Sequence, residues 1–186
     1  MEEERTIHNP FTGERGTFVE TSEETGGARS VIDFEVTPGG AGVPTHRHAD
    51  HEEQIEVLEG EIEVTLAGVA RRYGPGQRLV IPRNTVHAWR NALPDRPLRF
   101  RGQMTPGHPG FELFLRVWFG LARDGELRRN GLPRRFGDLS LLTTWDPSIL
   151  AGPRRLLAPL MSWSARRSRA HGRADELLRR YGGSEV

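Results

Sequence analysis

The chain has 186 residues, of which 35% are hydrophobic and 27% are charged, with a formal net charge of +1 and no cysteine. This composition is typical of a soluble globular protein of one ordinary domain. No apolar run approaches the roughly 20 residues of a membrane-spanning helix, and the acidic residues after Met1 do not form a secretory signal. We therefore expect a cytoplasmic protein without disulfides, in which any metal is held by histidine and carboxylate groups.

The charge is unevenly distributed along the chain. Residues 1–68 carry 16 acidic side chains and 4 arginines, whereas residues 69–186 carry 9 acidic side chains and 22 arginines. A basic tail can attract nucleic acid, but this tail also contains acidic residues and lacks a recognisable nucleic-acid motif. We expect neither nucleic acid nor a membrane as a partner.

The predicted elements begin with an extended arm and a β body. Residues 1–28 are polar and rich in turn residues, and they predict an N-terminal arm with at most one short strand, 17–20. In residues 29–108, segments with a period of two are separated by glycine and proline, which predicts a β-sandwich or barrel. The expected strands are 31–36, 54–58, 61–66, 77–81, 86–90 and 97–103.

Residues 109–186 change to helical spacing and predict an α-helical C-terminal extension. The first predicted helix runs from Phe111 to near Gly125, and a short segment at 138–145 follows it. Pro153 is expected in the first turn of the next helix, and a last helix should cover 174–181 before two glycines.

This extension also bears on the oligomeric state. Its apolar side chains offer more surface than a lone tail should expose to water, and strand edges of a small β body need cover. We predict a homodimer that uses Phe114, Trp118, Leu157, Leu160 and Trp163.

The segment from Thr45 to Gly60 contains most of the candidate metal ligands. His46 and His48 are two residues apart, so in an extended chain both imidazoles project to the same face. On the following strand Glu53 shares its face with apolar residues, whereas Glu52 belongs to the polar face. Because a carboxylate on an inward face is costly unless it is paired or binds a metal, Glu53 is the predicted ligand. His87, from a later strand, completes a set that suits a divalent first-row metal with an open position.

Two motifs identify a resemblance to the cupin superfamily. The first motif, G-x5-H-x-H-x(3,4)-E-x6-G, is matched from Gly40 to Gly60. The second, G-x5-P-x-G-x2-H-x3-N, is matched from Gly76 to Asn91, except that Asn84 replaces the middle glycine. That position needs a turn, and Asn is the next most tolerant residue of positive φ. The resemblance covers roughly residues 30–104 and implies an antiparallel cupin β-barrel or jelly roll, with His46, His48, Glu53 and His87 holding a metal in its mouth.

The resemblance leaves several functions open. The first is a metalloenzyme that acts on a small organic molecule, for example a dioxygenase in which Glu53 is both ligand and catalytic proton acceptor. The second is a non-catalytic module that binds or senses a small molecule, and the third is a metal-free epimerase-like barrel, which the intact ligand set disfavours. The metal could be iron, manganese, nickel, cobalt or zinc.

Several other residues receive weaker predictions. His51 is expected to face solvent or to lie behind the ligands, and His8, His108 and His171 are expected on the surface. Trp89 lies two residues after His87 on the same predicted strand, so both side chains project to the same face, and Trp89 either lines the pocket or packs in the core. The apolar neighbours expected beside the metal are Ile55 and Val57, and an inward orientation of Arg99 and Arg101 toward an anionic substrate is a further alternative.

Overall fold

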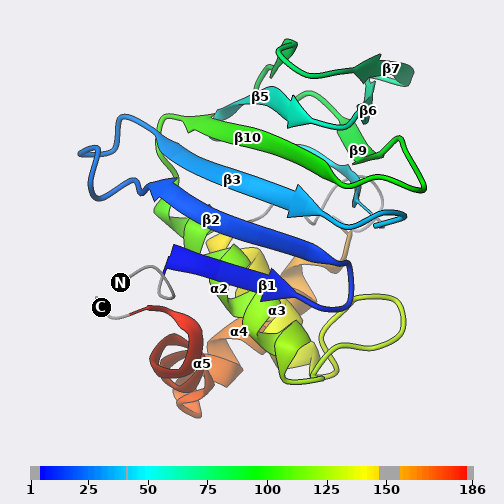
Figure 1. Ribbon diagram of the computed structural model, residues 1–186. Helices are drawn as coiled ribbons and strands as arrows, with labels where there is room; N and C mark the ends of the chain where they lie inside the picture. Colours follow the sequence, from blue (N-terminus) through cyan, green and yellow to red (C-terminus); the bar gives the residue numbers. More distant parts are fainter. Residues whose placement is uncertain (1–4, 41, 147–155, 184–186) are drawn as a thin grey trace.

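Two antiparallel sheets form the β body of the protein (Figure 1). The computed structural model describes residues 5–40, 42–146 and 156–183. Within these residues the strand order is β1-β2-β3-β10-β5-β8 in the larger sheet and β4-β9-β6-β7 in the smaller one. The strands are β1 (Thr6–Asn9), β2 (Glu14–Glu20), β3 (Ser30–Val36), β4 (Val43–His46), β5 (Glu52–Glu59), β6 (Ile62–Leu66), β7 (Val69–Tyr73), β8 (Arg78–Ile81), β9 (His87–Asn91) and β10 (Leu98–Thr105).

Burial alternates along the strands that face the core, as their sequence pattern predicts. In β5 the side chains of Glu53, Ile55 and Val57 are buried, whereas Glu52 and Leu58 are exposed. Antiparallel strands bury one face and leave the other to solvent. This alternation confirms the predicted jelly-roll body and the inward parity of Glu53.

The N-terminal residues contain more strand than the sequence predicts. They form two strands instead of at most one, because β2 extends back to Glu14 and β1 pairs with it. β2 in turn pairs with β3, so both strands lengthen the larger sheet. The division of the chain at residues 28 and 108 stays a prediction.

Four helices of the described residues follow the strands, in the order α2 (Pro109–Arg123), α3 (Phe136–Trp145), α4 (Ala158–Ala170) and α5 (Arg173–Tyr181). They confirm the helical extension, and α2 packs against β1 (Figure 1). The first turn of α2 is fixed to the β body by Glu112, a buried carboxylate that accepts hydrogen bonds from the Ser22 amide at 2.6 Å and from the Ser30 hydroxyl. The expected position of Pro153 lies outside the described residues.

Polar contacts join the later helices to α2 and to each other. The guanidinium of Arg173 on α5 donates two hydrogen bonds, of 2.8 and 2.7 Å, to the buried carboxylate of Asp138 on α3. The Tyr181 hydroxyl donates to Asp124 at the end of α2 at 2.7 Å. These bonds hold α3 and α5 in place around α2.

Side-chain directions decide one alternative and correct one expectation. Arg99 and Arg101 do not take the inward orientation that was left as an alternative, and Arg101 pairs with Asp33 on the solvent face of the sheet at 2.6 Å. Phe114 is buried, so the helical extension does not expose it as predicted, and the half-buried Trp118 lines a pocket. The other residues of the predicted interface, Leu157, Leu160 and Trp163, are exposed. No helix in the described part of the chain is long and apolar enough to span a membrane.

Candidate metal centre

Four donor side chains meet between the two sheets. One ligand atom from each of His46, His48, Glu53 and His87 lies within 4.8 Å of the others. β4 and β9 of the smaller sheet supply His46 and His87, which are cross-strand partners in the register. β5 of the larger sheet supplies Glu53, and His48 follows β4. The four residues predicted from the motifs are therefore close enough to share one ion.

The turn before His87 shows why the motif tolerates its one departure. Asn84 has φ +62°, the left-handed conformation that favours glycine and next asparagine. Its backbone amide donates to the carbonyl of His48 at 2.6 Å. The turn thus connects the loop that carries His48 to the strand that carries His87.

The electrostatics of the cluster favour a charged carboxylate. Burial alone would raise the pKa of Glu53, but the adjacent imidazoles of His48 and His87 outweigh it and hold that pKa well below its usual range. Glu53 Oε2 lies 3.5 Å from His48 Nε2 and 3.3 Å from His87 Nε2. Burial lowers the pKa of His48, yet Glu53 more than compensates, so the pKa of His48 is raised.

His87 is oriented as a metal ligand needs to be. Its Nδ1 lies 3.0 Å from the carbonyl oxygen of Thr85, which can only accept, so Nδ1 carries the hydrogen. Nε2 then faces the cluster and is the atom through which this ring could bind a metal. His87 Nε2 and Glu53 Oε2 are buried and have no hydrogen-bond partner among the described residues. Because such atoms are costly to bury without a partner, the donor set fits a divalent cation.

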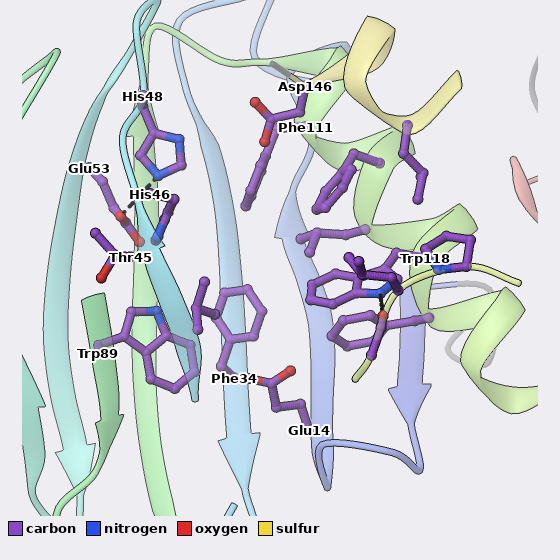
Figure 2. A pocket seen from close by; sticks show the side chains of 18 of the residues that line it. Glu14, Phe34, Thr45, His46, His48, Glu53, Trp89, Phe111, Trp118 and Asp146 are labelled. Carbon is purple, nitrogen blue, oxygen red and sulfur yellow. Dashed lines mark hydrogen bonds and ion pairs between the residues drawn. The ribbon is translucent and has the colours of Figure 1, made fainter. Parts of the chain in front are cut away.

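An apolar pocket adjoins the cluster (Figure 2). Its cavity volume is about 130 Å³, similar to the cavity of about 150 Å³ that holds benzene in an engineered protein. Strand residues such as Phe34 and Trp89 line one wall, and Phe111 and Trp118 of α2 line the facing wall. The Trp118 indole N–H donates to the carbonyl of Gly131, another lining residue, at 3.3 Å.

The pocket changes two expectations about apolar neighbours. Trp89 is 7% exposed and lines the pocket, so it takes both roles that its parity allows. Ile55 and Val57 are fully buried in the core and are not among the residues that line the pocket. The apolar lining comes mainly from aromatic residues and from the helical extension.

Two histidines outside the cluster are less exposed than surface positions would be. His51 is 2% exposed and its ring centroid lies 4.3 Å from that of His48, so of its two predicted positions it takes the one behind the ligands. Burial, with the charges of His48 and His108, lowers the pKa of His51 to about 3, so its ring is neutral. His108 is half-buried and caps α2, because its Nδ1 accepts from the Phe111 amide at 2.8 Å.

The pocket also contains a carboxyl group that sequence reasoning missed. Glu14 on β2 is 2% exposed and lines the same pocket as Glu53. Burial raises its pKa, and a hydrogen bond from Thr12 only partly offsets this effect. The available signal was its spacing of two and four residues from Gly16 and Phe18, which share its buried face.

Comparisons with known proteins agree with the motifs. Residues 32–101 match the cupin domain family. Solved structures similar to this chain include the cupin domain of Cnp3 from Schizosaccharomyces pombe, at 17% identity over 50% of this chain and 64% of that one, less than two thirds of its length (TM-score 0.45).

Two bacterial structures are also similar. An RmlC-like cupin from Shewanella frigidimarina is 19% identical over 60% of this chain and 92% of that one (TM-score 0.49). The polyketide cyclase RemF from Streptomyces resistomycificus is 27% identical over 50% and 65% of the two chains (TM-score 0.44). A search of curated proteins found no match. The family match, the two motifs and the antiparallel body that carries them agree that residues 32–101 form a cupin domain.

Proposed function

We propose that this protein binds one divalent transition metal through His46, His48, Glu53 and His87 and uses it to act on a small organic molecule. The observation that carries the proposal is the meeting of four donor atoms, two of them buried and unpartnered within the described residues, at the wall of an aromatic pocket. When bound, such a metal polarises a coordinated oxygen and, if it is redox-active, exchanges electrons.

The residues around the cluster fit catalysis as well as binding. Glu53 lines the pocket beside the other donor atoms, so it is the candidate to accept a proton from a bound substrate. Phe111, Trp118 and Trp89 line the same space with apolar rings, so a bound molecule that displaces water there would experience stronger electrostatic interactions. A dioxygenase is one reaction class that this arrangement suits. The identity of the metal, among iron, manganese, nickel, cobalt and zinc, belongs to the same proposal.

Elemental analysis of protein purified without a histidine tag tests the metal. We expect about one divalent metal per chain, and its loss in His48→Ala and in His87→Ala. Full metal content in both variants, or none in the wild type, would contradict the proposal. Because all four donors come from residues of the cupin body, the variants should keep the helical content of the wild type by circular dichroism.

A second candidate is a non-catalytic module that binds or senses a small molecule. The favouring observation is the pocket itself, which is mostly apolar and adjoins the cluster. Turnover of a bound compound by the metal-loaded protein distinguishes an enzyme from such a module. Binding without any conversion, over a panel of catechols, flavonols and 2-oxo acids, would favour the module.

The assembly and location are proposals of the same kind. We propose a cytoplasmic homodimer, now with Leu157, Leu160 and Trp163 as its exposed apolar residues. Light scattering at micromolar concentration should give twice the mass of the chain, and a monomer would contradict this prediction.

A further inference from the structure

Glu14 is a buried carboxyl group that the proposed metal chemistry does not use. It lies at the lower end of the view in Figure 2, with its carboxyl group directed into the pocket, whereas His48 and Glu53 lie at the upper end. Its Oε2 accepts a hydrogen bond from the Thr12 hydroxyl at 2.7 Å. Its Oε1 is buried and has no hydrogen-bond partner in the part of the chain that the structure describes.

In its local fold Glu14 uses only one carboxylate oxygen, which accepts from the Thr12 hydroxyl of the turn before β2. The turn between β1 and β2 is held by Asn9, whose Oδ1 accepts from the amides of Phe11 and Thr12 at 3.0 and 3.3 Å. The cross-strand neighbours of Glu14 in the sheet are Asn9 and Val36, neither of which is a cation. A buried carboxyl without a cationic partner costs free energy, and such costs are typical of residues retained for function.

The surroundings of Glu14 indicate what it can bind. The pocket between Glu14 and the metal cluster is lined by rings, among them Phe34, Phe100 and Trp118. A free carboxylate oxygen is an acceptor with room for a hydroxyl or an N–H group. An apolar, ring-containing molecule would fill the aromatic part, and a donor group on that molecule would satisfy Oε1.

We propose that Glu14 is the recognition residue for the end of the ligand that lies away from the metal, and that this end is a hydroxyl or N–H group on an aromatic or similarly apolar body. The inference rests on the proposed function only in assigning the other end of the ligand, an oxygen donor, to the metal. Selection of a donor-bearing ring by Glu14 does not itself need the metal.

A matched pair of small probes tests the proposal in metal-depleted protein. 4-Ethylphenol and 1-ethyl-4-fluorobenzene have almost the same shape, but only the phenol has a hydrogen-bond donor. We expect calorimetry to show the phenol binding to the wild type roughly 10-fold more tightly, because a hydrogen bond to a charged acceptor contributes that much or more.

The variants assign this preference to one carboxyl group. Glu14→Leu should abolish the advantage of the phenol, and Glu14→Gln, which keeps the shape and one oxygen acceptor, should reduce it. Glu20→Gln is the matched control, because Glu20 lies on the same strand and pairs with Arg29 in solvent. It should leave the preference unchanged. Thermal unfolding confirms that each variant is folded.

Two results would overturn the proposal. One is an equal preference for the phenol in the wild type and in Glu14→Leu, and the other is no preference in the folded wild type. Metal content is measured separately, so a failed metal site and a failed Glu14 site give different results. A phenol preference that depends on Glu14 in a protein that never binds metal would support this inference and contradict the proposed function.

Discussion

Glu53 and Glu14 are two buried carboxyl groups that line one pocket, but their surroundings shift their pKa values in opposite directions. Glu53 lies between two imidazoles, which hold its pKa low despite burial. Glu14 lies among apolar and aromatic groups with only a hydroxyl donor, and burial raises its pKa. The first environment is suited to a cation, and the second is suited to a neutral donor group. One pocket therefore has a cluster of ionisable donors at the end built from the cupin motif strands and a single carboxyl without a charged partner at the end built by β2.

The two walls of the pocket differ in a related way. The strand wall carries the donors of the proposed metal site, whereas the helical wall contributes Phe111, Trp118 and other apolar residues but none of the four donors. If this division is correct, damage to the helices should impair ligand binding and leave the metal in place.

The largest effect is expected when the helical wall is loosened. Asp138→Ala removes the buried partner of Arg173, whose side chain is only 13% exposed, and leaves it paired only with the exposed Glu176. Because a buried ion pair is broken but one partner remains, we expect a loss of about 3 kcal/mol in the free energy of unfolding, the lower end of the range for such pairs. Chemical denaturation measures this loss, and metal content should stay near that of the wild type.

The control for that experiment is Asp175→Ala, which removes an exposed carboxylate from the first turn of α5. It should cost less than about 1 kcal/mol. Equal destabilisation by the two variants would mean that the Asp138–Arg173 pair does not hold the helices together.

A smaller effect distinguishes two neighbouring carboxylates at the metal end. Glu53→Gln should weaken metal affinity by roughly 100-fold, because changes even to the outer partners of metal ligands cost 10–100-fold. Glu52→Gln changes a side chain on the exposed face of the same strand and should leave the affinity unchanged. Competition with a chromophoric chelator measures both, and equal effects would refute the strand-parity argument.

The smallest effect concerns Glu14 and pH. The pKa of Glu14 is higher in the folded state than in the unfolded state, so its burial destabilises the folded protein as pH rises through the folded-state pKa. Below pH 4.5 the carboxyl group is largely protonated in both states, and its burial has little effect on the free energy of unfolding. Glu14→Gln should therefore melt at nearly the wild-type temperature at pH 4 and at a higher temperature at pH 8. Calorimetry suffices, since 1 kcal/mol corresponds to about 2–4 °C for a chain of this size. A constant difference across this range would show that burial does not shift the titration of Glu14.

The sequence predicted the donor cluster at one end of the pocket far better than it predicted Glu14 at the other end. His46, His48, Glu53 and His87 could be found because a strand has a period of two and the motif spacing fixes which turns lie between them. Positive φ at Asn84 was expected for the same reason. The helices from 109 onward were also found from their apolar spacing, since periodicity is a local property.

What the sequence could not predict depends on contacts between distant segments. The inward direction of Phe114 and Trp118 is set by how α2 packs against β1, which no local pattern specifies. Glu14 was missed because Glu14, Arg15 and Gly16 have weak strand propensity, and pairing with β1 and β3 makes this segment a strand. The position of His51 was left between two alternatives because a loop has no periodicity from which its burial could be inferred.

The most direct measurement is the visible spectrum of the cobalt-substituted protein during titration with a bidentate oxygen compound, such as a catechol or a 2-oxo acid. It tests the central claim that a metal held by His46, His48, Glu53 and His87 is open to the pocket. We predict a saturable change in the cobalt absorption bands of the wild type, and no such change in His87→Ala. Cobalt bound with full stoichiometry but unresponsive to every such compound would mean that the metal is closed to ligands, and this would contradict the account.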